Sequence, residues 1–157
     1  MLSEKADNLE AKIHEACSNN ETDRVLKLLE SKNKEIDVEE IDENGSLYVA
    51  VQNENATVVE GLLEIGCNPN ITNSNRDIMI KCPLYLAIEK GNLKILKLLF
   101  QNNANANLKH MYGGTPLHYA VRNGDIQIVK ELLDNGADTD AQDRYQITPL
   151  IIALESK

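Results

Sequence analysis

The feature that most constrains this chain is a pattern of small and apolar residues that returns about every 33 positions. Ala87, Ala120 and Ala153 follow one another at intervals of 33 residues, and Ala16 and Ala50 continue the series toward the N-terminus at intervals of 34 and 37. Each alanine is preceded three positions earlier by an apolar residue: Ile13, Leu47, Leu84, Leu117 and Leu150. A period of this length predicts a row of stacked supersecondary units instead of a single globular core.

Each period has the pattern of two short helices, and residues 113–142 preserve it best. Thr115 and Pro116 are typical of a helix start, because a hydroxyl can cap free amides and proline fits the first helical position. Gly124 ends this helix, and a second amphipathic segment ends at Gly136. Its inward face is marked by an apolar pair that recurs in four units: Leu28-Leu29, Leu62-Leu63, Leu99-Phe100 and Leu132-Leu133. Two such helices cannot bury their apolar faces alone, so they need neighbours of the same kind.

These motifs resemble those of the ankyrin family. The family signature T-P-L-H-x-A is intact at residues 115–120, and Gly136-Ala137-Asp138 is a second intact element. Residues 148–150 repeat the opening as Thr-Pro-Leu, and residues 82–84 are a close variant. The resemblance covers roughly residues 8–157. It implies an all-α ankyrin-repeat solenoid of stacked helix-turn-helix units with hairpin-tip loops, curved around a concave groove.

The resemblance implies a single ankyrin-repeat domain over residues 1–157. Its expected units are 8–41, 42–77, 78–111, 112–144 and a partial unit at 145–157. The extra residues of the 37-residue interval predict a longer, apolar finger around residues 74–80. The acidic segment 34–44 is expected to be the first long loop, and Asp7 with Glu10 predicts a capping box at the first helix.

The fifth unit stops after its first helix, which leaves three interpretations open. The natural chain continues beyond Lys157, or this end is a cap that tolerates exposure, or it contacts another molecule.

Charge and composition exclude several classes of function. The net charge of −9 argues against nucleic-acid binding, which generally needs a basic surface. The three cysteines lack the paired spacing of a disulfide framework or a zinc site. The N-terminus has no apolar run that would make a signal peptide or a membrane span. We therefore expect a soluble cytoplasmic or nuclear protein that is monomeric in isolation, binds no nucleic acid and inserts into no membrane.

Candidate catalytic residues have structural interpretations. Cys17, Cys67 and Cys82 fall at small, buried positions of the repeat. His14 and His118 occupy a position at which, by the resemblance, a histidine hydrogen-bonds neighbouring backbone; Tyr48 and Tyr85 stand there in other units. His110 lies in a loop and is expected to face solvent or a partner. The glycine spacings fit no phosphate-binding loop. We expect no catalysis, no cofactor and no metal.

Two loop asparagines, Asn70 and Asn107, match a turn position of the family. The resemblance implies a structural hydrogen bond there. Asparaginyl hydroxylases modify that position in some ankyrin proteins, but the residues around it match imperfectly, and we expect the structural role alone.

The function implied by the resemblance is protein binding on the concave groove. The family's variable contact positions carry over onto Lys81, Glu89, Lys90, Met111, Tyr112, Tyr119, Arg122, Asn123, Arg144 and Tyr145. Further positions of the same kind are Asp42, Asn44, Val49, Gln52, Asn53, Leu86, Gly114, Ile147 and Ile152.

Five of these residues form the sharpest hypothesis. Tyr112, Tyr119 and Tyr145, together with Arg122 and Arg144, fall on the fourth and fifth units, and tyrosine and arginine are enriched at binding hot spots. The alternative is that the tyrosines only pack on the adjacent finger.

Acidic residues are concentrated at the other end of the chain. Residues 1–70 hold sixteen acidic and six basic residues, a net of −10, whereas residues 71–157 hold nine acidic and ten basic, a net of +1. The acidic run 35–43 is either a solvated loop or a surface that steers a basic partner.

The sequence thus predicts a non-catalytic protein-interaction module, an adaptor or scaffold. Two alternatives remain: a small inhibitor or regulatory subunit of an enzyme such as a kinase, and the N-terminal ankyrin segment of a larger protein. Neither the motifs nor the composition identifies the partner.

Overall fold

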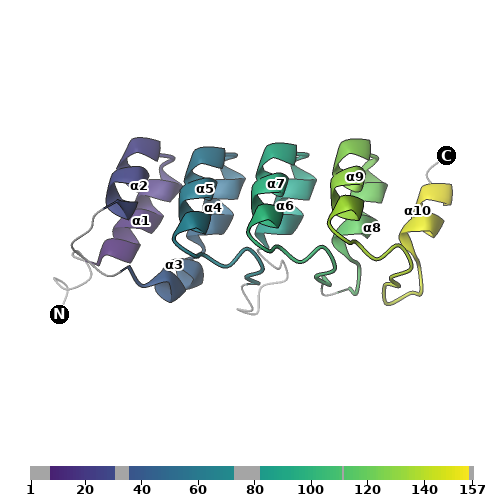
Figure 1. The fold of residues 1–157 in the computed structure, drawn as a ribbon. Helices are drawn as coiled ribbons and strands as arrows, with labels where there is room; N and C mark the ends of the chain where they lie inside the picture. The colour runs from purple at the N-terminus through teal and green to yellow at the C-terminus, as the bar shows by residue number, and fades with distance from the viewer. Residues whose placement is uncertain (1–7, 31–35, 73–81, 111, 156–157) are drawn as a thin grey trace.

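The computed structural model describes residues 8–30, 36–72, 82–110 and 112–155. Figure 1 shows a row of helix pairs whose connecting loops project from one side. The helices are α1 (Leu9–Ser18), α2 (Thr22–Leu29), α3 (Val38–Asn44), α4 (Ser46–Gln52), α5 (Ala56–Glu64), α6 (Pro83–Glu89), α7 (Leu93–Gln101), α8 (Pro116–Asn123), α9 (Ile126–Asp134) and α10 (Pro149–Glu155). The described residues contain no strand. The predicted all-α repeat solenoid is confirmed.

The helices form two layers (Figure 1). The first helices of successive pairs contact one another in the order α1, α4, α6, α8 and α10. The second helices form a parallel row in the order α2, α5, α7 and α9. Each pair therefore packs on the next through both of its helices, as a one-dimensional stack requires.

The core lies where the two layers meet. Ala16, Ala50, Ala87 and Ala120 are fully buried, and so are the apolar residues three positions before them. Alanine fits here because its small side chain lets neighbouring helices approach closely, while the leucines fill the space between the layers; full burial of a leucine contributes roughly 1.5–3 kcal/mol. In the fifth unit Leu150 is 66% exposed, as expected where no second helix covers it.

One expectation about the acidic segment 34–44 is wrong, because the segment contains the helix α3 instead of an extended loop. The carboxylate of Asp37 caps α3 by accepting a hydrogen bond from the backbone N of Glu40 at 3.2 Å. Ile41 is fully buried, and α3 contacts both α1 and α4. Gly45 then ends the helix at a φ of 75°. One buried apolar residue and good caps thus make a helix of a strongly acidic segment.

The start of α1 also differs from the prediction. Asn8 is the cap: its side chain accepts hydrogen bonds from the backbone N of Glu10 at 2.8 Å and of Ala11 at 3.2 Å. The carboxylate of Glu10 instead accepts a hydrogen bond from the backbone N of Asp37, the residue that caps α3, at 3.0 Å. The predicted capping box is therefore wrong for Glu10, and Asp7 lies outside the described residues.

Histidine and tyrosine make the same bond between units. The backbone N of Thr115 donates to His118 Nδ1 at 3.0 Å, so this atom is the acceptor and Nε2 carries the proton. His118 Nε2 lies 3.0 Å from the carbonyl oxygen of Ile147 and donates to it. The Tyr85 hydroxyl contacts the carbonyl of Gly114, the equivalent residue one unit earlier, at 2.8 Å. The structural role predicted for this position is confirmed for His118, whereas the contact of His14 is to a side chain, the Ser46 hydroxyl, at 3.2 Å from Nδ1.

Asparagine side chains tie the loops of adjacent units together. Asn70 Nδ2 donates to the carbonyl of Asn103 at 3.0 Å, and Asn70 Oδ1 accepts from the backbone N of Asn105 at 2.7 Å. Asn107 repeats both bonds one unit later, to the carbonyl of Gly136 at 2.9 Å and from the backbone N of Asp138 at 2.7 Å. The structural role expected for these asparagines is confirmed, and the side-chain bonds connect each of them to the turn of the following unit.

The three cysteines are buried free thiols, as expected for structural positions. Burial raises the pKa of the Cys17 thiol to about 12 and raises the pKa of Cys67 and Cys82 as well. In Cys67 the nearby charge of Asp42 adds to the effect of burial. All three thiols are therefore protonated near neutral pH, and the thiolate, which is the reactive form, is scarce.

No helix in the described part of the chain is both long and apolar enough to cross a membrane.

Replacing Asn107 by alanine tests the bonds between loops. The Asn107→Ala variant loses both hydrogen bonds to the next unit, and we expect a free energy of unfolding lower by about 1–2 kcal/mol, measured by urea denaturation. Asn123→Ala is the matched control, because the Asn123 side chain is exposed at the end of α8 and lies away from the loops. Equal denaturation midpoints for the two variants would contradict the structural role of Asn107.

Thiol labelling tests the burial of the cysteines. In native protein at pH 8 we expect Ellman's reagent to react with all three thiols at least about 100-fold more slowly than in guanidinium-unfolded protein, because a raised pKa and burial both suppress attack. A thiol that reacts rapidly in the folded state would show that its unit opens readily.

Candidate binding surface

The structure gives the three predicted tyrosines two different environments. Tyr112 and Tyr145 lie on the projecting loops of the fourth and fifth units and are 43% and 65% exposed. Tyr119 lies on α8 and is half-buried. The packing alternative therefore applies to Tyr119, whose ring is half-buried. The hot-spot hypothesis applies to Tyr112 and Tyr145, whose side chains are exposed.

Tyr119 belongs to an aromatic cluster with Tyr85 and His110. Its ring meets the edge of Tyr85 at 5.0 Å between centroids and 77°, and lies 5.5 Å from His110. Tyr85 and His110 are 5.4 Å apart, and Tyr112 lies 5.7 Å from His110 at the outer edge. Such edge-on pairs contribute roughly 0.5–1.5 kcal/mol each beyond their burial. The cluster links α6, α8 and the loop between α7 and α8.

His110 is therefore not a solvated residue as one of our expectations had it. It is half-buried, and its Nδ1 is buried with no hydrogen-bond partner in the described part of the chain. Burial lowers the pKa of the imidazole, so the ring is neutral near pH 7 and packs as an aromatic group. Nothing in the local sequence distinguished it, because Tyr85 lies 25 residues away in the chain and Tyr112 and Tyr119 belong to the next unit.

Arg144 is held between two exposed rings. Its guanidinium carbon lies 4.3 Å from the centroid of Tyr112 and 4.6 Å from that of Tyr145. It also donates a hydrogen bond to the Tyr145 hydroxyl. Stacking on aromatic faces stabilises an arginine by roughly 0.5–1 kcal/mol at exposed sites. Arg144 thereby joins the fourth loop to the fifth. We refer to Tyr112, Arg144 and Tyr145 together as the exposed patch.

Backbone contacts hold these two loops together. Gly113 has a φ of 78°, and a Cβ built there would lie 3.0 Å from the backbone N of Arg144. Both the conformation and the close approach require glycine. The Asp143 carboxylate accepts hydrogen bonds from the backbone N of Tyr145 at 2.8 Å and of Ile147 at 3.0 Å. The positions of Tyr112, Arg144 and Tyr145 are thus set by the loop backbone.

The remaining predicted positions that the structure describes lie on or directly after the helices α6 and α8. Arg122 and Asn123 are exposed at the C-terminal end of α8, and Glu89 is exposed at the end of α6. Lys90 forms an ion pair with Glu54 at 3.6 Å, which ties it to the preceding unit. Two further predicted positions, Lys81 and Met111, lie outside the described residues.

Some of the wider set of contact positions is not available to a partner. Leu86 and Ile152 are buried, so the prediction of a surface role is wrong for both. Asn53 donates to the carbonyl of Cys17 at 2.9 Å, and Asp42 accepts from the backbone N of Asn68 at 3.0 Å. These two side chains make hydrogen bonds within the repeat stack. A family position that is carried over by resemblance does not determine which contacts the residue at that position makes in this chain.

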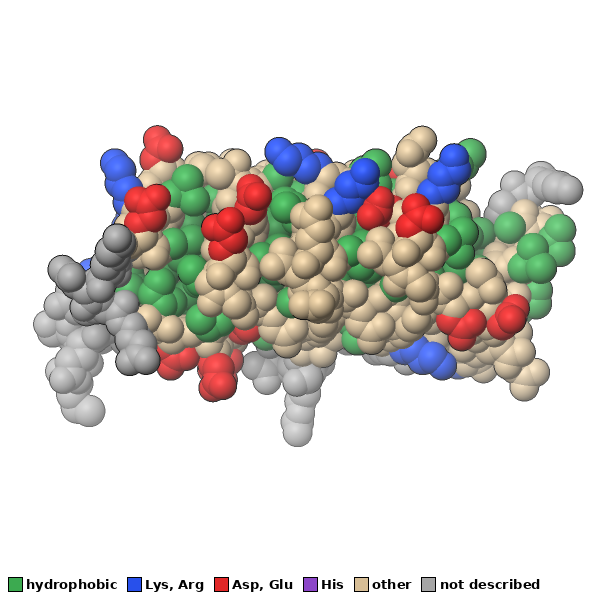
Figure 2. All heavy atoms as spheres, viewed as in Figure 1, with side chains coloured by type: hydrophobic (Ala, Val, Ile, Leu, Met, Phe, Trp, Pro, Cys, Tyr) green, Lys and Arg blue, Asp and Glu red, His purple; other side chains and the backbone are tan. Residues whose placement is uncertain are grey.

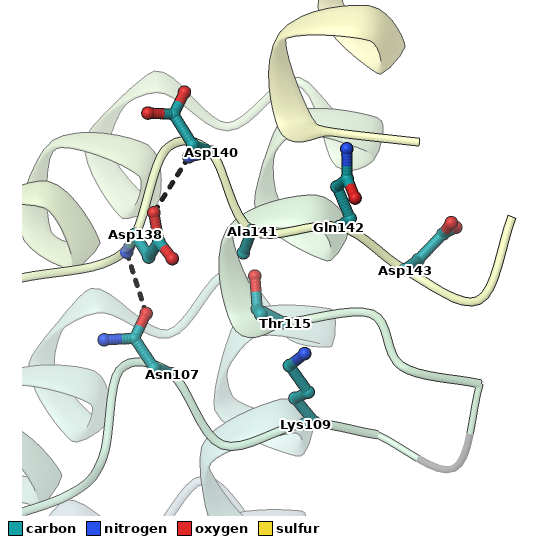
Figure 3. Close-up of a pocket in the computed structure, with 8 residues that line it drawn as sticks. All are labelled: Asn107, Lys109, Thr115, Asp138, Asp140, Ala141, Gln142 and Asp143. Carbon is teal, nitrogen blue, oxygen red and sulfur yellow. Dashed lines mark hydrogen bonds between the residues drawn. The ribbon is translucent and has the colours of Figure 1, made fainter. Parts of the chain in front are cut away.

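A shallow polar depression lies between the fourth and fifth loops (Figure 3). Some of its polar groups are engaged in turns: the Asp138 carboxylate accepts a hydrogen bond from the backbone N of Asp140 at 2.9 Å, and the backbone N of Asp138 donates to the Asn107 side chain. Its lining residues are Asn107, Lys109, Thr115, Asp138, Asp140, Ala141, Gln142 and Asp143. Among all described residues, no group of three or more His, Cys, Asp or Glu side chains is arranged to hold a metal ion.

Comparison with known proteins agrees with the architecture. Residues 84–157 match the family profile described as ankyrin repeats (3 copies). The chain is also similar to FPV230 of fowlpox virus (strain NVSL), which is named as an ankyrin repeat protein, with 39% identity over 67 residues. This alignment covers 43% of the chain and 34% of the viral protein, so the chain spans about a third of that relative's length. The structure continues the same helix pairs back to α1, beyond the matched residues.

Single alanine variants test the two environments of the tyrosines. We expect Tyr119→Ala to lower the free energy of unfolding by about 2 kcal/mol, because it opens the aromatic cluster. Tyr145→Ala should cost under about 1 kcal/mol, because the ring is exposed and contacts mainly Arg144. Thermal and urea denaturation of both variants measure the difference. A larger loss for Tyr145→Ala than for Tyr119→Ala would contradict these assignments.

Proposed function

Because residues 84–157 match the profile of ankyrin repeats and the structure continues the same helix pairs back to α1, we propose that the chain is a non-catalytic protein-binding module whose partner contacts the exposed patch of Tyr112, Arg144 and Tyr145. Ankyrin repeats are in general protein-interaction modules, and the family is typically non-catalytic. The observation that supports the proposal is the geometry of the exposed patch. The guanidinium carbon of Arg144 lies over two exposed tyrosine rings, at 4.3 Å from Tyr112 and 4.6 Å from Tyr145, and the close backbone approach at Gly113 constrains the loops that carry them.

The physical basis of the proposal is the low cost of ordering these side chains on binding. An aromatic ring has two side-chain torsions, and a stacked arginine has already lost much of its rotamer freedom. A partner that covers the exposed patch therefore gains contact area without the entropic cost of ordering these side chains first. Tyrosine and arginine in such an arrangement are the residue types most often found at interface hot spots.

An adaptor and an inhibitory subunit would use this surface in the same way. They differ in what is bound: an inhibitor forms a stable one-to-one complex with a single enzyme and lowers its activity. Isolation of the bound partner, followed by an assay of that partner in the presence and absence of the chain, separates the two.

The experiment is affinity capture from a lysate of the source cells, read by mass spectrometry. The test variant carries Tyr112→Ala and Tyr145→Ala, and Tyr119 is left in place because it supports the fold. The control is Ile126→Ala, which removes a side chain of the second-helix layer that is 68% exposed. We expect a partner that the wild type and the control retain and the double variant loses by at least about tenfold, as the removal of two hot-spot residues implies.

Circular dichroism and thermal unfolding confirm that the three proteins are equally folded. If the double variant retained the partner equally well, the binding site would lie outside the exposed patch, and the proposal would be contradicted.

A further inference from the structure

The ring of His110 is the common member of the aromatic contacts beneath the exposed patch. Its centroid lies 5.4 Å from that of Tyr85, 5.5 Å from that of Tyr119 and 5.7 Å from that of Tyr112. These three rings come from α6, from α8 and from the fourth loop, so displacement of the imidazole disturbs all three. Its Nδ1 is buried and has no hydrogen-bond partner among the described residues, so packing holds this side of the ring.

The backbone of His110 closes the loop that carries Tyr112. The backbone N of His110 donates to the carbonyl of Gly114 at 2.8 Å, and the backbone N of Gly113 donates to the carbonyl of His110 at 2.7 Å. The carbonyl of Tyr112 in turn accepts from the backbone N of Arg144 at 3.2 Å, which docks the fourth loop on the fifth. The position of His110 is therefore coupled to the exposed patch.

A second proton on the His110 ring is unfavourable in this position. A protonated imidazole donates from both nitrogens, and Nδ1 has no partner within the described chain to accept its hydrogen. Burial also disfavours the charged form and lowers the pKa of the ring. His118 differs, because its Nδ1 accepts from the backbone N of Thr115 and its Nε2 donates to the carbonyl of Ile147.

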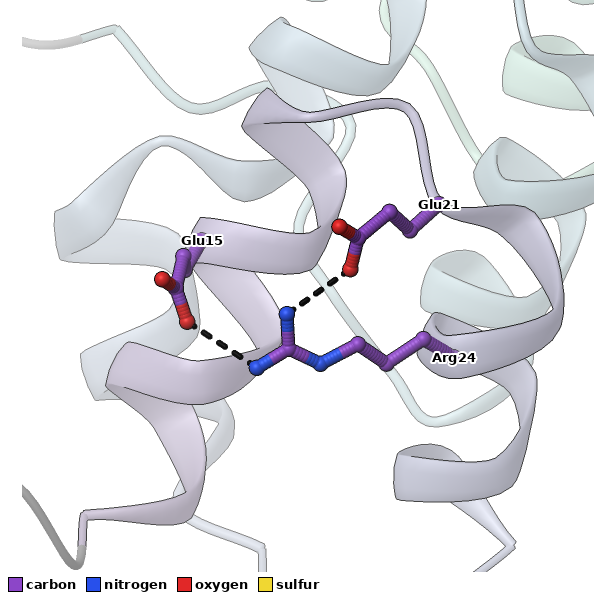
Figure 4. Close-up of polar contacts among 3 residues, drawn as sticks. All are labelled: Glu15, Glu21 and Arg24. Carbon is purple, nitrogen blue, oxygen red and sulfur yellow. Dashed lines mark hydrogen bonds and ion pairs between the residues drawn. The ribbon is translucent and has the colours of Figure 1, made fainter.

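A positive charge on His110 would also lack compensation by a carboxylate. Arg24 shows such compensation, since it contacts Glu21 at 2.7 Å and Glu15 at 3.0 Å (Figure 4). The acidic side chains that Figure 2 shows lie at the outer surface of the molecule, where water surrounds them. The titratable groups that pack against His110 are the tyrosines of α6, α8 and its own loop, and a phenol is uncharged near neutral pH. Among the described residues, no carboxylate forms an ion pair with this ring.

We propose that His110 is a pH-sensitive switch for the exposed patch: the neutral ring holds the loop of Tyr112 in place, and protonation drives the ring out of the cluster and undocks that loop from Arg144. The undocked loop takes up the proton at the ordinary histidine pKa of 6.5, whereas the docked loop takes it up only at lower pH. The docked state is therefore fully favoured above pH 6.5 and becomes less favoured as the pH falls below it. The inference rests on the proposed function and adds a regulation of the same surface.

An NMR titration of the histidine rings in the full chain tests the protonation step. The signal of His110 is assigned by its absence from the spectrum of the His110→Phe variant. We expect His110 in the wild type to titrate at lower pH than histidine in the urea-unfolded chain. A midpoint equal to or above the unfolded value would overturn the proposal, and this comparison needs the variant only for assignment.

Hydrogen exchange of two backbone amides, those of Gly113 and Arg144, tests whether the loop undocks. Their protection factors, which correct for the intrinsic effect of pH on exchange, should fall at least about threefold between pH 7.5 and 5.5 in the wild type. His110→Phe keeps an aromatic ring but takes up no proton, so its protection factors should stay constant. His14→Gln is the matched control: it removes a histidine of the first unit and should keep the wild-type response. His118 is present in all three proteins, so any effect of its own protonation would remain in His110→Phe.

The outcomes separate the switch from the proposed function. An equal loss of protection in the wild type and in His110→Phe would assign the effect to another group and overturn the switch, as would protection that is independent of pH. Neither result changes the capture experiment on the Tyr112 and Tyr145 variant, which decides the proposed function at pH 7.5.

Lysate capture repeated at pH 5.5 joins the two proposals. We expect the wild type to lose the partner and His110→Phe to retain it. If the loop undocks at pH 5.5 and the wild type nevertheless retains the partner, protonation of His110 does not control binding, which overturns the switch as a regulator of the patch.

Discussion

The contact on which the whole structure depends is the close approach of successive first helices at the buried alanines. A single pair of seven- to ten-residue helices has too little apolar surface to offset the entropy of ordering its backbone. Stacking converts each exposed leucine face into an interface, so stability comes from neighbour contacts instead of from one central core. Leu150 on α10 obeys the same rule: the equivalent Leu117 is buried between the layers, whereas Leu150 is exposed because no second helix among the described residues covers it.

Polar bonds between units then fix how one pair sits on the next. His118 and Tyr85 have different side chains, yet each reaches the carbonyl 29 residues ahead. Asn70 and Asn107 do the same for the loops. Apolar packing alone tolerates small sliding motions between helices, whereas these directional bonds accept only one register. The loops that carry Tyr112 and Tyr145 are therefore positioned by bonds whose donors lie in other units.

The repeat period predicted the helix pairs and their buried face from the sequence, because both follow from residue spacing. α3 was missed because one buried isoleucine in an acidic segment gives no periodic signal, and the caps at Asp37 and Gly45 are local features that count only once Ile41 has a core to enter. The candidate site was predicted in part. Its tyrosines and arginines were found from family positions, but the roles of His110 and Gly113 were not, because both depend on contacts with residues one unit away.

The surface that we propose for binding is built on the same contacts that hold the last two units together. Tyr119 contributes to the stack through Tyr85 and His110, and the cluster that it forms supports Tyr112 on one side. Arg144 joins Tyr112 to Tyr145 and so couples the two loops. A partner that covers Tyr112, Arg144 and Tyr145 would therefore strengthen the contact between the fourth and fifth units as well as occupy the surface. Binding and repeat stacking are linked here, since any ligand that favours the docked loops stabilises the packing of the fifth unit on the fourth.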